Sequence, residues 1–358
     1  MTTNLPSGTP GTRDADAAPA IPRGTLVDRF GRAHHDLRIS LTDRCSLRCT
    51  YCMPAEGVPW LARSTMLSTA EIVHVARVGV DLGIREIRLT GGEPLLRVDV
   101  VDVVRRLTAL TTPDGAPVEV SLTTNALRLP ALAAPLRDAG LTRVNISLDT
   151  LDRARFTELT RRDKLVETLA GIAAADAAGL HPVKINAVAM RGVNDDEVVA
   201  LTRFAVERGY QMRFIEQMPL DGGHTWDRTE MVTQAEILER LRGAFRLTEV
   251  PGRGAAPAEL WHVDGGPATV GVIASVSAPF CGACDRLRLT ADGQLRACLF
   301  SQTEVDTREV LRSEASADLV DEGLAAAYRQ CLAGKKAGHD IDDPTFLQPR
   351  RPMSAIGG

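Results

Sequence analysis

Residues 37–52 read Leu-Arg-Ile-Ser-Leu-Thr-Asp-Arg-Cys-Ser-Leu-Arg-Cys-Thr-Tyr-Cys, a strand-like run that leads directly into three closely spaced cysteines. From Leu37 to Thr42, apolar and polar residues alternate. Successive side chains of a strand point to opposite faces, so this strand has one apolar and one polar face. A polar strand face that ends in a cysteine loop sets the expectation for the segments that follow.

Five further strand-like runs come after it, and amphipathic, helix-like stretches separate them. Strands and helices that alternate in this way are typical of an α/β fold with a parallel sheet. The six predicted strands are Leu37–Thr42, Glu86–Thr90, Val118–Asn125, Arg143–Asp149, Pro182–Met190 and Gln211–Met218.

The polar strand faces favour a barrel. A parallel strand that helices cover on both sides is nearly continuously apolar, whereas Glu86–Thr90 and Arg143–Asp149 alternate; the pattern of Gln211–Met218 is ambiguous. Helices on the apolar faces would turn the polar faces inward, around a large polar ligand. We therefore predict an incomplete (β/α)6 TIM-like barrel. The alternative is an ordinary solvated antiparallel sheet, which the intervening helices disfavour.

Two signals mark helix starts. Ser68 followed by Glu71 fits a capping box, and Asn194 precedes three acidic residues that suit a helix N-terminus. Beyond residue 218 the pattern changes, with a helix-like run near Thr233–Leu241 and a strand-like run near Thr269–Ser277. We predict a disordered tail over residues 1–30, a partial barrel over 31–218 and a C-terminal region over 219–358 that closes the barrel.

The composition excludes several classes of protein. Lysine and arginine total 42 against 46 aspartates and glutamates, which argues against binding to nucleic acid or to an anionic membrane. No apolar run is long enough to span a bilayer, and residues 1–24 do not resemble a secretory signal. We therefore expect a cytoplasmic protein, whose seven cysteines are metal ligands or catalytic thiols rather than disulfides.

The first cysteine trio, Cys45, Cys49 and Cys52, lies just after the first predicted strand. Three thiolates on one short loop suit a soft metal centre. Structural zinc would need a fourth protein ligand, which is missing nearby, whereas a four-iron cluster with three cysteines keeps one iron open. The second strand ends in Gly91-Gly92-Glu93-Pro94, where glycines permit a close backbone approach to a ligand and the glutamate could accept from an ammonium group.

The second trio, Cys281, Cys284 and Cys298, lies in the C-terminal region. By spacing alone it also fits a zinc ribbon that lacks one ligand, which Asp285 or His262 could supply. Two neighbouring arginines favour an anion site beside a cluster, because guanidinium groups bind phosphate through paired donors. The remaining cysteine, in a late helical stretch, is interpreted as a core thiol. The arginines are Arg286 and Arg288, and the core thiol is Cys331.

The cysteine loop and the Gly-Gly-Glu-Pro strand end together resemble the radical S-adenosylmethionine (SAM) superfamily. With the second trio and the terminal Gly357-Gly358, the sequence from Leu37 onward is similar to the GTP 3′,8-cyclases of that superfamily, which begin molybdenum cofactor biosynthesis. The resemblance also rests on several strand motifs: Ile87–Leu95, Thr123–Asn125, Asn145–Asp149, Val183–Asn186 and Arg213–Glu216. Ala126 stands where relatives usually have glycine.

The resemblance implies a lyase with two [4Fe-4S] clusters, one on each cysteine trio, and SAM as a cofactor. A radical derived from SAM removes hydrogen from C3′ of GTP, and C3′ then bonds to C8; no protein residue serves as nucleophile or general base. The residues that the resemblance assigns to SAM are Tyr51, Gly92, Ser147 and Met218. Those that it assigns to GTP are Arg38, Arg88, Thr123, Lys184, Arg286, Leu287 and Arg288.

The resemblance further implies a tail that inserts toward the active site, an electron donor such as flavodoxin or ferredoxin, transfer of product to the next enzyme of the pathway and possible homodimers. Two alternatives remain. A radical peptide-maturing enzyme would carry an auxiliary cluster, but such enzymes have more C-terminal cysteines. A non-catalytic, zinc-stapled binding module is disfavoured by the acidic balance and by an aromatic content of 4%.

Overall fold

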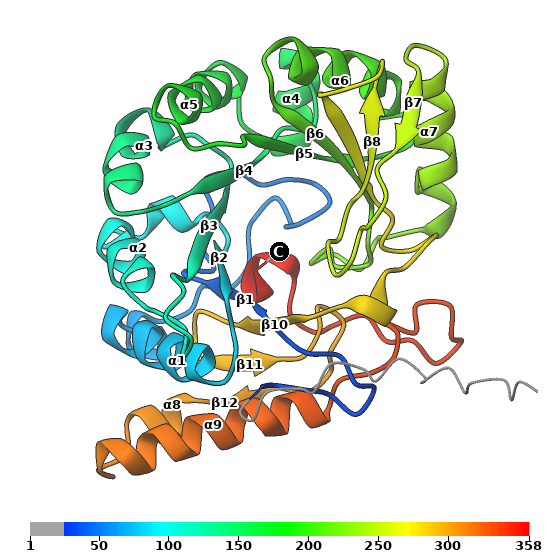
Figure 1. Cartoon of the computed structure of the whole chain (residues 1–358). Coiled ribbons are helices and arrows are strands. Elements are labelled where there is room, and N and C mark those ends of the chain that lie inside the picture. Colours follow the sequence, from blue (N-terminus) through cyan, green and yellow to red (C-terminus); the bar gives the residue numbers. More distant parts are fainter. Residues whose placement is uncertain (1–24, 358) are drawn as a thin grey trace, which may run out of the picture.

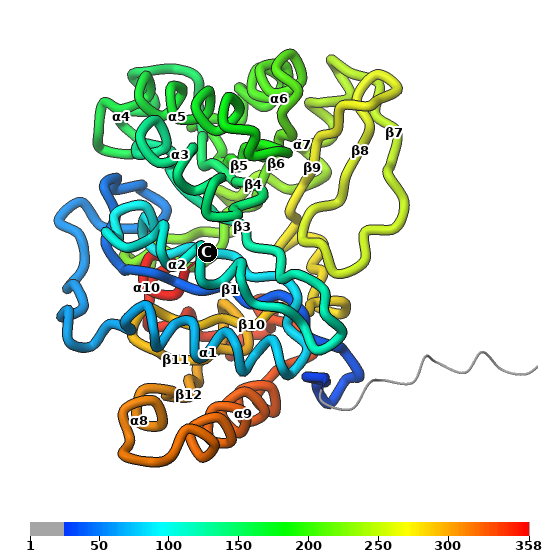
Figure 2. Tube along the Cα trace, turned by 60° about the vertical axis from the view of Figure 1, so that its left-hand side comes forward, coloured from blue at the N-terminus to red at the C-terminus, as the bar shows by residue number. Residues whose placement is uncertain are grey.

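The computed structural model describes residues 25–357 (Figures 1 and 2). Most of the predicted tail, residues 1–24, and the terminal Gly358 lie outside the described residues. Residues 25–30 take part in the fold, because Leu26 is buried and Val27 bridges to Ala33. None of the described helices is both long enough and apolar enough to cross a membrane.

All six predicted strands are confirmed, and every boundary lies within two residues of its predicted position. They pair in chain order as parallel neighbours. The strands are β1 (Asp36–Ser40), β2 (Glu86–Thr90), β3 (Glu119–Thr124), β4 (Arg143–Ser147), β5 (Lys184–Ala189) and β6 (Gln211–Glu216).

Helices cover the outer face of these strands (Figure 1), because each strand directs its apolar side chains outward; Ile39, Ile87 and Leu122 are fully buried there. The first helix begins with the predicted capping box between Ser68 and Glu71. The helices are α1 (Thr69–Asp81), α2 (Val100–Thr108), α3 (Leu129–Asp138), α4 (Arg153–Thr160), α5 (Leu165–Ala177) and α6 (Val198–Glu207), with short 3-10 turns at Arg63–Thr65, Pro94–Leu96 and Asp195–Glu197.

The start of α6 differs from the prediction. The acidic residues form a 3-10 turn, and the α-helix begins only at Val198. Asn194 does not cap this helix: its side chain bonds to backbone groups of Met190, Asp149 and Val188 at 2.8 Å each. The sequence signal for a helix start therefore reflects a loop that ties two strand ends together.

The barrel is open, as predicted, but the parallel series is longer than six strands. Within residues 25–357, β10 (Arg286–Leu289) pairs in parallel with β1, and β9 (Thr269–Ile273) pairs in parallel with β6. Antiparallel strands continue from both, so the sheet does not close on itself. The ambiguous β6 resolves into an alternating strand, with Met212 and Phe214 buried against the helices and Arg213 facing the interior.

The C-terminal region supplies the strands at both edges of the sheet. Its long helix α9 (Ala317–Ala333) packs on α1, where the Tyr328 hydroxyl donates to the Val75 carbonyl at 3.0 Å. Cys331 on this helix is buried, as expected of a core thiol. The other elements are α7 (Gln234–Arg242), β7 (Leu247–Glu249), β8 (Glu259–Val263), β11 (Gln294–Arg296), β12 (Val305–Asp306), α8 (Arg308–Leu311), α10 (Met353–Ile356) and 3-10 turns at Arg228–Glu230 and Cys281–Ala283.

Candidate active site

A cavity of about 280 Å³ occupies the interior of the open barrel. A second cavity of about 60 Å³ adjoins it. The first trio lines the larger cavity and the second trio lines the smaller one. Residues shared by both linings join the two: Met218, Ser275, Phe280, Arg286, Arg288 and Leu299. The two trios, far apart in the sequence, therefore face one continuous space.

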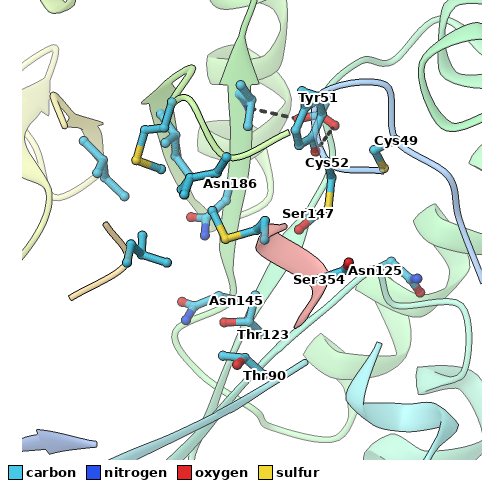
Figure 3. Close-up of a pocket in the computed structure, with 18 of the residues that line it drawn as sticks. Cys49, Tyr51, Cys52, Thr90, Thr123, Asn125, Asn145, Ser147, Asn186 and Ser354 are labelled. Carbon is cyan, nitrogen blue, oxygen red and sulfur yellow. Dashed lines mark hydrogen bonds between the residues drawn. The ribbon is translucent and has the colours of Figure 1, made fainter. Parts of the chain in front are cut away.

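The first trio sits on the loop after β1, at the carboxyl end of the parallel strands, where sites of α/β barrels are built. Arg48 folds this loop by donating to the Cys45 carbonyl at 2.7 Å, and Arg161 holds it from outside by donating to the Arg48 carbonyl at 2.7 Å. Figure 3 shows Cys49 and Cys52 beside the cavity. The loop is thus shaped by arginines that bond to its carbonyl groups rather than to its thiols.

Burial governs the chemistry of this trio. It raises the pKa of Cys45, raises that of Cys49 well above its ordinary range and raises that of Cys52 to about 12. The negative charges of Glu93 and Asp149 add to the effect on Cys45 and Cys49 respectively. These thiols keep their protons at neutral pH until a metal centre displaces them.

The Gly-Gly-Glu-Pro strand end serves the fold in a way that the sequence did not indicate. A Cβ at Gly92 would collide with the carbonyl groups of Arg44 and Asp43, so the glycine lets β2 lie against the cysteine loop. Glu93 is 1% exposed, and it accepts from the Thr124 hydroxyl and from a backbone amide at 2.7 Å each. Its carboxylate thus ties β2 to the end of β3, and because Glu93 also lines the cavity, its expected role as an acceptor for an ammonium group stays a prediction.

The four residues that the resemblance assigns to SAM, namely Tyr51, Gly92, Ser147 and Met218, all line the larger cavity. The Tyr51 hydroxyl donates to Asp149 at 2.8 Å (Figure 3). Burial raises the pKa of Asp149 to about 6. The tyrosine beside Cys52 is therefore fixed against the end of β4.

Arginines on neighbouring strands form a row along the cavity. Arg288, Arg38 and Arg88 occupy the same level of β10, β1 and β2. Burial and the charge of Arg88 hold the pKa of Arg38 well below its ordinary value. In the part of the chain that the structure describes, Nε of Arg38 and Nε of Arg286 are buried without a hydrogen-bond partner. Buried cations with unused donors suit a polyanion such as a triphosphate.

Three other residues assigned to GTP take different positions. Thr123 lines the cavity (Figure 3). Lys184 lies on the inner face of β5 but outside the lining of the cavity, and burial together with nearby Arg213 lowers its pKa to about 7. The Leu287 side chain is fully buried in the core between sheet and helices, so only its backbone can face a ligand.

The predicted site residues do not include Arg213, which lines the cavity on β6, or Asn145 and Asn186, which line it from the polar strand faces that were expected to point inward. The alternation of Met212-Arg213-Phe214 was the signal for the arginine. The two asparagines have buried side-chain oxygens without partners among the described residues. They extend the polar wall of the cavity.

The second trio has a different electrostatic setting. Cys281 begins a 3-10 turn, and the Cys284 amide closes it by donating to the Cys281 carbonyl at 3.1 Å. Burial by itself would raise the pKa of Cys284, but the positive charges of Arg286 and Lys335 outweigh this effect and bring the pKa to about 7. Burial raises the pKa of Cys281 to about 11. One thiol of this trio is thus poised for deprotonation.

The zinc-ribbon alternative finds no support in the geometry of this second site. Neither Asp285 nor His262, the proposed fourth ligands, lines the cavity at this trio. Three soft thiols that border a cavity fit a cluster, which also leaves room for a ligand on the fourth iron.

The C-terminal segment enters the barrel, as the resemblance implies (Figure 1). The Gly357 carbonyl accepts a hydrogen bond from Arg288, and Met353 N donates to the Leu220 carbonyl at 3.1 Å. A Cβ at Gly357, whose φ is +87°, would collide with the Thr90 hydroxyl. Ser354 lines the cavity beside Cys52 (Figure 3). The tail is therefore part of the cavity wall.

The departure at Ala126 has a structural consequence. Ala126 has a φ of +68°, a conformation that favours glycine. Gly171 on α5 packs so closely on its carbonyl that a Cβ there would collide. The turn after β3 is thus left-handed and tightly packed, and alanine occupies it at a cost in backbone strain.

Known proteins share both halves of this arrangement. Residues 39–205 match the Radical SAM superfamily, and residues 210–341 match the Molybdenum Cofactor Synthesis C family. The first match contains the first cysteine trio and the second contains the second trio.

Curated relatives match over nearly the whole chain. A GTP 3′,8-cyclase of Streptomyces coelicolor is 56% identical and covers 93% of this chain and 96% of its own length. One from Corynebacterium glutamicum is 54% identical, with 96% and 92% covered. One from Mycolicibacterium smegmatis is 52% identical, with 97% and 96% covered.

Solved structures agree with the fold. Streptococcus suis SuiB bound to S-adenosylmethionine superposes with a TM-score of 0.57 at 14% identity, covering 91% of this chain and 79% of that chain. At this identity the likeness shows the fold alone. The sequence relatives carry the family assignment: the chain belongs to the GTP 3′,8-cyclases of the radical SAM superfamily.

Proposed function

We propose that the chain is a lyase that converts GTP to (8S)-3′,8-cyclo-7,8-dihydroguanosine 5′-triphosphate, the first step of molybdenum cofactor biosynthesis. The observation that carries this proposal is the row of arginines on neighbouring strands of the cavity, in which Asp36 is paired with Arg38 at 3.9 Å and the Nε donors of Arg38 and Arg286 lack hydrogen-bond partners among the described residues. A nucleoside triphosphate needs such a row for its phosphates. The family match leaves no support for the peptide-maturing enzyme or for the zinc-stapled binding module.

At the first trio, Cys45, Cys49 and Cys52 would hold a [4Fe-4S] cluster, and Tyr51, Gly92, Ser147 and Met218 would contact SAM beside it. When bound, this pair supplies the radical that removes hydrogen from C3′ of the ribose. Met353 and Ser354 of the tail form part of the wall here and would limit the access of water to this part of the cavity. Exclusion of water protects a reactive radical from side reactions.

GTP would lie along the arginine row. Arg38 and Arg88 would neutralise phosphate oxygens, and the unused Nε donors of Arg38 and Arg286 would pair with them. Lys184 on β5 would add a positive charge. Thr123 and the backbone of Leu287 would contact the nucleoside. These groups bind and orient GTP so that C3′ and C8 meet, and no side chain is assigned as nucleophile, acid or base.

The finer part of the proposal concerns the second trio and the partners. Cys281, Cys284 and Cys298 would hold a second [4Fe-4S] cluster whose open iron binds the purine, while Arg288 secures the tail beside it. The chain would take electrons from a flavodoxin or ferredoxin, pass its product to the next enzyme of the pathway and form homodimers. We also propose the division into a barrel up to residue 218 and a cluster-binding region beyond it.

Product analysis under anaerobic conditions tests this function. The reconstituted chain, incubated with GTP, SAM and a reductant, should form the 3′,8-cyclised nucleotide and 5′-deoxyadenosine together. Arg88→Met should lose most of the product, whereas Arg85→Met should not, because Arg85 is exposed and paired with Asp114 outside the cavity. Absence of cyclised nucleotide from an iron-loaded, SAM-cleaving chain would refute the proposal.

A further inference from the structure

Lys335 is a buried cation beside the second trio that the proposed chemistry does not use. The residue follows the end of α9 and is 3% exposed. Its ammonium donates to the Arg286 carbonyl at 2.6 Å and to the Ala297 carbonyl at 3.0 Å, and it lies 3.7 Å from the Cys284 sulfur. All its close partners therefore belong to the segments that carry the second trio.

A buried ammonium is costly without a negative partner. In the part of the chain described by the structure, no aspartate or glutamate forms an ion pair with Lys335. The carboxylate of Asp28, which lies behind the same loop, already pairs with Arg32 at 2.6 Å and His34 at 3.2 Å. Of its three hydrogen-bond partners, only the Cys284 sulfur can carry a negative charge.

The hydrogen bonds of Lys335 also join two chain segments. Arg286 comes two residues after Cys284, and Ala297 directly precedes Cys298. One ammonium therefore holds together the backbone of two cysteine-bearing segments. The remaining cysteine of the trio, Cys281, is held in the same way, because Arg32 donates to its carbonyl at 2.5 Å.

We propose that Lys335 is a positioning residue for the second cluster, which sets the spacing of its cysteines and makes the cluster easier to reduce. This inference rests on the proposed second cluster. A four-iron cluster on three thiolates gains about one negative charge when it takes up one electron. A buried positive charge 3.7 Å from one of its sulfur ligands stabilises the reduced form more than the oxidised form.

The test isolates the second cluster in the full-length chain. Changing Cys45, Cys49 and Cys52 to Ala removes the first site, and the reconstituted chain should bind about four irons. On this background, Lys335→Met removes both charge and hydrogen bonds, whereas Lys335→Gln removes the charge and keeps a donor. Lys336→Met is the matched control, because the Lys336 side chain is exposed and pairs with Asp340. Iron content and the midpoint potential, from a viologen-mediated titration, are measured for each variant.

We expect the ratio of reduced to oxidised cluster at a fixed potential to fall about tenfold in both Lys335 variants, a shift of about 59 mV to more negative values. Lys335→Met should in addition bind less iron, and Lys336→Met should match its parent. An unchanged potential in iron-loaded Lys335→Gln would overturn the proposal even if Lys335→Met failed to fold. A background chain that binds no iron would instead refute the second cluster itself.

Discussion

The two cysteine trios carry the same ligands in different electrostatic surroundings. Around the first, burial and the carboxylates of Glu93 and Asp149 disfavour negative charge. Around the second, Arg286 and Lys335 favour it enough to bring the pKa of Cys284 to about 7. The same fold thus provides one site with carboxylates near its thiols and one in which a thiol lies beside two cations.

This difference suits two distinct tasks. A cluster in surroundings that oppose further negative charge is a strong reductant, which the cleavage of a sulfonium requires. A cluster beside arginines can hold an anionic nucleotide and keep its cysteines spaced. The arginine row with Arg38 and Arg88 lies between the two sites and is where the substrate would connect them.

Removal of either trio is expected to have the largest effect, and the two losses should differ in kind. Changing Cys45, Cys49 and Cys52 to Ala should abolish formation of 5′-deoxyadenosine. Changing the cysteines of the second trio to Ala should abolish cyclised product while SAM cleavage persists. Each change should lower the iron content from about eight to about four per chain. Equal loss of SAM cleavage in both would contradict the division of tasks.

A methyl group at Gly357 is expected to have the next largest effect. The added Cβ would collide with the Thr90 hydroxyl at a backbone φ of +87° and displace the tail from Arg288. A displacement of about 1 Å in an active site can lower turnover by about a hundredfold. Gly357→Ala should therefore lose turnover but keep its iron, and Gly338→Ala, where a Cβ meets only Asp340 at 3.7 Å or beyond, should behave as wild type.

The charge of Lys184 should make nucleotide binding depend on pH. Burial, followed by the charges of Arg213, Arg143 and Arg88, lowers its pKa to about 7, so the free protein loses this proton as the pH rises through 7. A bound triphosphate favours the charged form, and GTP should bind more weakly between pH 7.5 and 9, by up to about tenfold per pH unit.

Calorimetric titration of GTP across this range measures the effect. Lys184→Met should remove the dependence, and Lys164→Met should retain it, because Lys164 is exposed and pairs with Glu167. The folded chain should also gain stability between pH 7 and 10.5, since the unfolded chain then binds more protons at this lysine. A pH-independent affinity in wild type would exclude Lys184 from the phosphate site.

Relief of strain behind the first trio should have the smallest effect. Ala126 follows Asn125, whose side-chain amide lies 3.8 Å from the Cys45 sulfur. Ala126→Gly removes a positive-φ alanine and should raise the free energy of unfolding by about 0.5–1 kcal/mol. Ala178→Gly, at a right-handed helix end, should lower it. Denaturant unfolding of the apo chain decides between gain and loss, and a loss in Ala126→Gly would show that packing of the methyl group outweighs the strain.

Local patterns were sufficient to predict the six-strand core, because alternation fixes which face of β1 or β2 is buried. They were also sufficient for both trios, whose cysteines are close in sequence. They predicted β9 as a strand near Thr269–Ser277 but not its pairing with β6, and they did not predict β10 or its pairing with β1. The alternation of Arg286-Leu287-Arg288 is the signal that could have identified β10 and the burial of the Leu287 side chain away from the arginines.

Long-range contacts account for the rest. Lys335 lies 51 residues from Cys284, and nothing near it in the sequence marks it as a partner. The structural role of Glu93 was missed for a similar reason: its carboxylate accepts from Thr124 and Asn125, which come from the next strand and the turn that follows it. Residues whose environment comes from another strand or helix require the three-dimensional structure.

Midpoint potentials of the two single-cluster chains, measured without nucleotide or SAM, test the contrast between the trios most directly. One chain has Ala at Cys45, Cys49 and Cys52, and the other has Ala at Cys281, Cys284 and Cys298. The electrostatics predict a less negative potential for the cluster beside Arg286 and Lys335 than for the cluster beside Glu93 and Asp149. Equal potentials, or the reverse order, would contradict this account.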